Sequence, residues 1–138
     1  MAGAGADTHQ IIQPLVGFAD GRITAFDFDN CEYAWFVKDI AVLLFYVARS
    51  EARGQREQAV AAFLAPFLEG YREHRRCDRE WLATIPDWLA LQRSMNYALF
   101  HQYRDPAQRD EATLDAWSRF RRDIEADAPV VELDFAGF

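Results

Sequence analysis

Residues 21–40 read GRITAFDFDNCEYAWFVKDI, and this stretch decides how the rest of the chain is interpreted. It begins with an apolar run, Ile23 to Phe28, which follows the turn signal Asp20-Gly21 and therefore predicts a β-strand. Two carboxylates, Asp27 and Asp29, lie on the same side of this extended chain, because side chains alternate with a period of two. Acids about 6–7 Å apart, by strand rise, are typical of a hard-cation site; a solvated acidic turn is the alternative.

A second apolar segment lies upstream of this run and is interrupted by Pro14. Proline cannot donate a hydrogen bond to a neighbouring strand, so we expect an edge strand or an irregular one that pairs with residues 23–28. This predicts a β-hairpin over residues 9–28, which must pack on other elements because two strands alone are marginally stable. Residues 1–8 lack the basic and apolar regions of a signal peptide, which predicts a flexible leader before a single domain over residues 9–138.

Residues 36–138 predict a helical lobe of about four to five helices. The clearest helical period is in residues 85–103, where one apolar face is formed by Trp88, Leu91, Met95 and Leu99. Another helix, over residues 55–75, contains Pro66, which should kink it or divide it. Asp78 is expected to cap a short helix that follows. The hairpin and the lobe together predict an α+β fold that is mostly α.

Composition excludes several classes of function. The chain has 138 residues, of which 51% are hydrophobic and 14% aromatic, with a net charge of −7, so it is globular and lacks the basic face of a nucleic-acid binder. No apolar run approaches the roughly 20 residues of a membrane span. Cys31 and Cys77 fit neither a disulfide framework nor a zinc site, which predicts free thiols and a cytoplasmic location. Eleven Phe and four Trp exceed what one small core hides, which favours a homodimer.

The run GRITAFDFDNCEYAWFVKDIAVLLFY, residues 21–46, resembles the segment that follows the catalytic loop in the aminoglycoside phosphotransferase and homoserine kinase-like family. These enzymes are small-molecule kinases with a protein-kinase-like fold. Phe26-Asp27-Phe28 matches the triplet whose Asp binds Mg²⁺ on the nucleotide phosphates, and Asp39-Ile40-Ala41 matches a triplet that opens a helix. The resemblance, over residues 17–138, implies Asp27 as the metal ligand, Mg²⁺ as the cofactor, and a structural role for Asp39 in bracing the catalytic loop.

The catalytic loop of that family is not found where the resemblance would place it. The loop has the form His-Gly-Asp-x-His-x-x-Asn and should fall on Thr8 to Leu15. Gln10 stands at the position of the catalytic Asp, and Leu15 at that of the metal-binding Asn. The nucleotide-binding N-lobe would lie upstream of Met1. Phosphoryl transfer depends on positioning phosphates, metal and nucleophile together, so the resemblance implies a C-lobe that is not a competent kinase alone.

The acceptor-substrate cleft of the resembled family implies a set of pocket residues. The family lines this cleft with the helix that matches residues 85–103 and with the helix before it, so the implied polar wall consists of Gln92, Arg93, Asn96 and His101. His101 has a surface or capping role as its alternative. The aromatic connector after Asn30 contributes Tyr33 and Trp35, which either line the pocket or seal the sheet against the first helix.

Three functions of different classes remain open from the sequence. The first is a degenerate phosphotransferase-like C-lobe without kinase activity, which binds a small molecule or another protein as a homodimer. The second is a non-kinase enzyme that uses Asp27 or Asp29 as general acid or base in the old acceptor cleft. The third is part of a small-molecule kinase whose N-lobe is supplied elsewhere or truncated.

Overall fold

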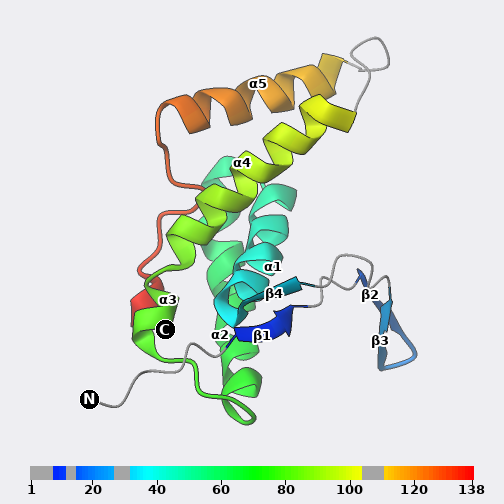
Figure 1. The fold of residues 1–138 in the computed structure, drawn as a ribbon, viewed down its shortest axis with the longest axis vertical. Helices are drawn as coiled ribbons and strands as arrows, with labels where there is room; N and C mark the ends of the chain where they lie inside the picture. The colour runs from blue at the N-terminus through cyan, green and yellow to red at the C-terminus, as the bar shows by residue number, and fades with distance from the viewer. Residues whose placement is uncertain (1–7, 12–14, 27–31, 104–110) are drawn as a thin grey trace.

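The computed structural model describes residues 8–11, 15–26, 32–103 and 111–138, and it shows two small sheets beside a helical lobe (Figure 1). The expected fold class, α+β and mostly α with a helical lobe, is confirmed. In chain order, the elements are β1 (Thr8–Ile11), β2 (Leu15–Ala19), β3 (Arg22–Phe26), β4 (Glu32–Trp35), α1 (Phe36–Ser50), η1 (Arg53–Gln55), α2 (Arg56–Arg72), α3 (Arg79–Leu82), α4 (Ile85–Tyr103), α5 (Glu111–Glu125) and η3 (Phe135–Gly137).

The strands form two antiparallel pairs instead of one long hairpin. β2 pairs with β3 across Asp20 and Gly21, whose φ angles of 50° and 70° are those that a tight hairpin turn requires. β1, in contrast, pairs with β4, so that Thr8 lies opposite Trp35. The single hairpin expected over residues 9–28 was therefore wrong in its first part. The segment that we interpreted as an aromatic connector is the missing strand, in keeping with the high β-propensity of its aromatic residues.

The hydrophobic core surrounds α1, which packs against both α2 and α4. α1 contributes Val37, Ile40 and Leu44, all essentially inaccessible to solvent. Leu64 of α2 and Leu89 of α4 are equally buried against them. The periodic apolar residues of three helices thus meet in one core, and the order of these helices along the chain follows the predicted one.

Two details of the helices bear on the sequence analysis. α2 runs as one helix from Arg56 to Arg72 with Pro66 inside it on an exposed side, so Pro66 does not divide the helix. Asp78 does occupy the N-cap position of α3, but its side chain makes no capping hydrogen bond. Its carboxylate instead accepts a long hydrogen bond of 3.4 Å from Arg76.

Three arginines bind the C-terminal segment to the helical lobe. Arg93 of α4 donates to the carbonyl oxygen of Ala128 at 2.7 Å, and Arg79 of α3 donates to that of Ala136 at 2.8 Å. Arg72 of α2 reaches the carbonyl oxygen of Phe138 at 3.0 Å. Two apolar side chains of the same segment are buried in the core, Val131 and Phe135. The segment is therefore part of the packed lobe.

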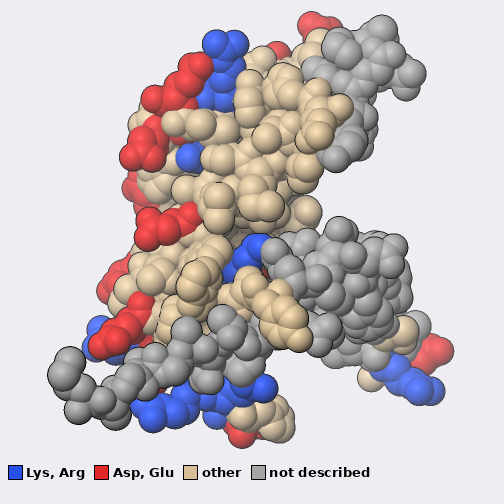
Figure 2. Space-filling model, in the orientation of Figure 1, with Lys and Arg blue, Asp and Glu red and all other residues tan. Residues whose placement is uncertain are grey.

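Of the predicted apolar face of α4, only Trp88 packs against the core. Leu91, Met95 and Leu99 are exposed by 46%, 41% and 47%, while α4 buries other residues, among them Leu89. α1 likewise exposes two large apolar side chains. We call this surface the α1–α4 face and define it by Leu43, Tyr46, Leu91, Met95 and Leu99. Figure 2 shows a broad tan area over α4 and α1, with the acidic residues gathered along one edge.

Two further observations concern the class of protein. Cys77 is a buried free thiol, as expected, while Cys31 lies outside the described residues. None of the helices in the described part of the chain is long and apolar enough to cross a membrane.

Candidate functional site

The predicted metal site lies at the junction between β3 and β4. β3 ends at Phe26 and β4 begins at Glu32, so Asp27 and Asp29 belong to a segment outside the described residues. Among the residues that the structure does describe, no three His, Cys, Asp or Glu side chains are grouped to hold a metal ion. The assignment of Mg²⁺ to Asp27, and of acid or base chemistry to either carboxylate, therefore stays a prediction.

Asp39 lies in the first turn of α1, where a negative charge interacts favourably with the helix dipole. Burial raises the pKa of its carboxyl group from the usual 3.8 to about 6, and the neighbouring charge of Lys38 only partly opposes this shift. The charge of Asp39 in turn contributes to the raised pKa of Tyr71, which places the two side chains near each other. The role of Asp39 in bracing the backbone of the catalytic loop stays a prediction.

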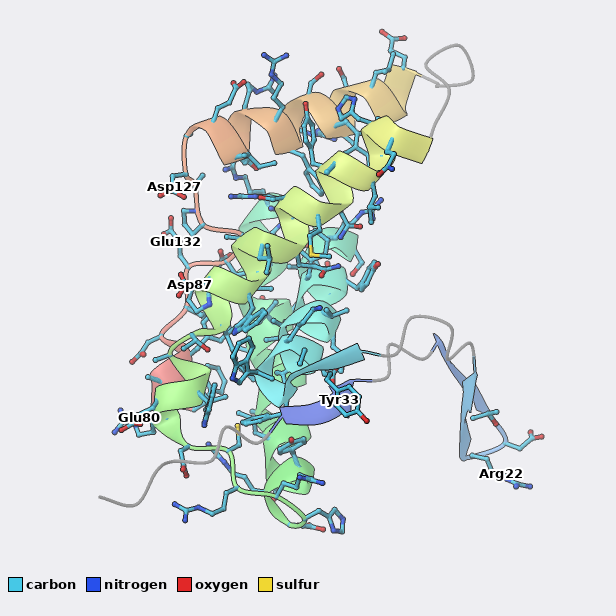
Figure 3. All side chains as sticks on the ribbon, viewed as in Figure 1. Arg22, Tyr33, Glu80, Asp87, Asp127 and Glu132 are labelled. Carbon is cyan, nitrogen blue, oxygen red and sulfur yellow. The ribbon has the colours of Figure 1, made fainter. Side chains whose placement is uncertain are left out.

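Trp35 of β4 connects the sheet formed by β1 and β4 to α4. Its ring centroid lies 5.7 Å from that of Trp88, with the two rings tilted by 49°. This contact fits the interpretation in which the aromatic segment seals the sheet against the helices. Tyr33, two residues earlier, is exposed by 82% and points into solvent (Figure 3). The two aromatic residues of β4 therefore have different surroundings.

The four polar residues predicted on α4 also have different surroundings. Gln92 and Arg93 are buried, and Arg93 is turned toward the C-terminal segment through its bond to Ala128. The side-chain amide of Asn96 donates to the backbone oxygen of Gln92 at 2.8 Å, within its own helix. His101 is exposed and packs edge-on against Tyr97, with ring centroids 4.5 Å apart. A substrate-binding role for these residues stays a prediction.

The sequence contains a second partial match to the catalytic loop, in another register. A shift of three residues places Asp7 and His9 on the Asp-x-His of His-Gly-Asp-x-His-x-x-Asn. Ile12 then stands at the position of the metal-binding Asn, so the loop is incomplete in this register too. The signal that could have revealed the match is the two-residue spacing from the acid Asp7 to the histidine His9. β1 begins at Thr8, between these two residues.

Comparison with known proteins connects this geometry to a family. No family model matches the chain. A curated protein named amicoumacin kinase, from Bacillus subtilis (strain 168), is 39% identical over 118 residues, which are 84% of this chain and 35% of that protein. A solved structure of an amicoumacin kinase in complex with AMP-PNP, Ca²⁺ and Ami superposes with a TM-score of 0.79 at 36% identity, covering 88% of this chain and 37% of the other.

Both matches extend over most of this chain, and the chain spans about a third of the length of each relative. Identity of this level over more than 100 residues agrees with the likeness in fold. The expected kinship is therefore confirmed: the chain is homologous to a partial, C-terminal-like region of the aminoglycoside phosphotransferase-like kinases.

Proposed function

We propose that this chain is a phosphotransferase-like C-lobe without kinase activity of its own, which binds a small molecule and assembles as a homodimer in the cytoplasm. Its kinship with the kinases supports the small-molecule part of the proposal. The incomplete catalytic loop supports the lack of activity, because either register leaves the metal-binding Asn position apolar, as Leu15 or Ile12. The free thiol of Cys77 fits a reducing compartment.

The α1–α4 face is the observation that carries the assembly. Leu91, Met95 and Leu99 follow one another at four-residue spacing, so they form one stripe along α4. Each is exposed by more than 40%, although large apolar side chains of this kind gain roughly 1.5–3 kcal/mol from full burial. Exposed large apolar side chains that lie together on one surface mark an interaction site. A second copy of the chain would cover it with an identical surface, as two-fold dimers do.

Sedimentation equilibrium at micromolar concentration tests the homodimer. The double variant Leu91→Glu/Met95→Glu places two charges on the face, and we expect it to sediment as a monomer while the parent chain sediments as a dimer. The matched control is Ala62→Glu/Ala65→Glu, which adds the same charge on exposed positions of α2 and should remain dimeric. A parent chain that is monomeric throughout this range, or a control that dissociates equally, would remove the basis for the homodimer.

A second candidate function is supported by the lengths of the relatives. Because the chain spans 35% of amicoumacin kinase, it can serve as one part of a small-molecule kinase, with a separate polypeptide supplying the nucleotide-binding lobe. The α1–α4 face would then contact that polypeptide. The acceptor would be amicoumacin or a compound of its class, as the name of the relative suggests.

Calorimetry with two ligands separates these functions. The C-lobe module should bind amicoumacin and show no heat with ATP and Mg²⁺. Measurable binding of ATP and Mg²⁺ that is lost in Asp27→Asn would favour the kinase part instead. Absence of heat with both ligands, for a chain shown to be folded by its circular dichroism, would contradict the small-molecule part of both functions.

A further inference from the structure

A cavity of about 320 Å³ is lined by residues from the end of α1, the turn into α2, the start of α2 and α5. Figure 1 shows that these elements lie away from the two sheets. Its volume is at the lower end of the range for small-molecule sites. We call it the arginine pocket, and its lining residues are Arg49, Glu51, Ala52, Arg53, Arg56, Ala116, Trp117, Arg119, Phe120 and Asp123. None of the side chains predicted for the acceptor cleft or the metal site is among them.

The charge of the arginine pocket is opposite to that of the whole chain. Four arginines and two carboxylates line it, although the chain carries a net charge of −7. One carboxylate, Asp123, already accepts a hydrogen bond from Arg53 at 3.2 Å. The guanidinium of Arg49 lies over the ring of Trp117, 5.9 Å from its centroid. Guanidinium groups gathered in this way repel one another, so the pocket favours an anion.

Two buried nitrogen atoms point to the place of that anion. In the part of the chain that the structure describes, the Nε atoms of Arg56 and Arg93 are buried and have no hydrogen-bond partner. Arg93 is only 4% exposed, so its Nε cannot turn to solvent. Burial lowers the pKa of Arg93, the charges of Asp123 and Asp127 oppose this shift, and the charge of Arg56 adds to it. Arg56 and Arg93 line the same small notch. A buried N–H without an acceptor costs about 1–3 kcal/mol, so one oxygen atom that served both groups would stabilise this arrangement.

A notch beside the arginine pocket has room for such an oxygen. It is lined by Arg56 and Arg93, and it shares Arg49, Phe120 and Asp123 with the larger cavity. Its volume of about 10 Å³ admits one oxygen atom or one water molecule. An anion in the arginine pocket can therefore extend one oxygen toward the two unpartnered Nε atoms while its other oxygens face the remaining arginines.

The apolar part of the pocket indicates what the anion is attached to. Phe100 stacks on Trp117 at 4.0 Å, so this face of the indole is covered, and the edge of Phe120 lies beside it at 5.1 Å. An apolar group bound in the pocket would contact the parts of Trp117 and Phe120 that line it, while its charged end faces the arginines. Arginine binds phosphate through paired hydrogen bonds, and a phosphate offers enough oxygens for several guanidinium groups.

We propose that the arginine pocket binds a small phosphate ester whose apolar or aromatic group rests on Trp117 and Phe120. One phosphate oxygen enters the notch between Arg56 and Arg93, and the others contact Arg53 and its neighbours. The site is separate from the α1–α4 face, and of the residues predicted for the acceptor cleft it includes only Arg93, which lines the notch.

Titration with phenyl phosphate, followed by calorimetry and by tryptophan fluorescence, tests the proposal. We expect binding in the submillimolar range that weakens as salt is added, and no binding of phenol, which lacks the anion. Arg56→Gln should weaken phenyl phosphate binding by at least about tenfold, since it removes one charged partner of the notch. Arg53→Gln, on a side chain that is 72% exposed, should weaken it by a smaller factor.

The matched control is Arg121→Gln on α5, whose exposed guanidinium pairs with Glu125 at 2.8 Å and does not line the pocket. It changes the net charge equally and should leave binding unchanged. The proposal is overturned by the absence of binding at millimolar phenyl phosphate. It is also overturned if Arg121→Gln weakens binding as much as Arg53→Gln does, which would indicate only a diffuse charge effect. Binding that persists unchanged in both Arg53→Gln and Arg56→Gln would place the ligand elsewhere.

Discussion

Replacing Asp39 by asparagine should stabilise the fold at neutral pH, because the carboxylate is partly removed from water in α1. Burial raises the pKa of Asp39 from 3.8 to about 6, so the folded state holds the proton more tightly than the unfolded state does. The free energy of unfolding should therefore fall as the pH rises from about 4 to about 6, and the loss is complete above this window.

The magnitude follows from the size of the shift. A change of about two pKa units corresponds to about 3 kcal/mol, and we halve it to about 1.5 kcal/mol because water still reaches part of the side chain. Loss of the favourable dipole interaction in the first turn removes about 0.5 kcal/mol of the gain. Asp39→Asn should thus be more stable than the parent by about 1 kcal/mol at pH 7.5, and the difference should shrink by more than half at pH 4.5.

Urea unfolding, monitored by tryptophan fluorescence at several pH values between 4.5 and 8, measures this difference. Asp87→Asn is the matched control, since Asp87 occupies the first turn of α4 and is exposed. Asp87→Asn loses the favourable interaction with the helix dipole and removes no buried charge, so it should be slightly less stable than the parent at pH 7.5. If Asp39→Asn is instead destabilised at pH 7.5, the carboxylate has a charged or hydrogen-bonded partner that outweighs its burial, and the reasoning fails.

Three further predictions concern packing, and thermal or urea unfolding checks each one. Leu64→Ala should cost about 2–5 kcal/mol because the side chain is fully buried, whereas Leu114→Ala, exposed by 44%, should cost less than about 0.5 kcal/mol. Arg93→Met should cost about 2 kcal/mol by removing the charged hydrogen bond to Ala128, and hydrogen exchange should increase in the C-terminal segment; unchanged exchange would contradict this. Pro66→Ala should stabilise the chain by about 1–2 kcal/mol, because it restores a helical N–H on an exposed face; a lower midpoint would show that Pro66 packs favourably.

The helices could be predicted from the sequence because the spacing of apolar residues that indicates a helix involves only near neighbours along the chain. The longest one, expected over residues 85–103, is α4 with the same limits. The pairing of β1 with β4 could not be predicted, because it joins residues more than 20 positions apart and the apolar alternation of both segments is short. Asp20-Gly21 correctly indicated the turn between β2 and β3, but a turn fixes only the strands that adjoin it.

The direction in which a helix faces was harder to predict than the helix itself. Periodicity shows that Leu91, Met95 and Leu99 share a side of α4, but not whether that side meets the core. The core-facing side of α4 includes Arg93, whose guanidinium is buried against a backbone carbonyl that comes from the far end of the chain. No pattern within the helix signals such a partner. The arginine pocket was missed for the same reason, since α5 and the end of α1 come together only in the folded chain.

The two sides of α4 constrain what can cover the α1–α4 face. A helix that is apolar on both sides is normally buried between two layers, and one of these layers is the core around α1. The second layer must supply apolar side chains that fit the stripe of Leu91, Met95 and Leu99, and both proposed functions require such a layer. The two assemblies differ in symmetry. In a homodimer the stripe meets its own copy, so Met95→Glu places two like charges near the two-fold axis. A different polypeptide would meet only one such charge. A complementary Met95→Lys variant, mixed with Met95→Glu, should therefore restore association in the homodimer, and failure to do so would favour the second polypeptide.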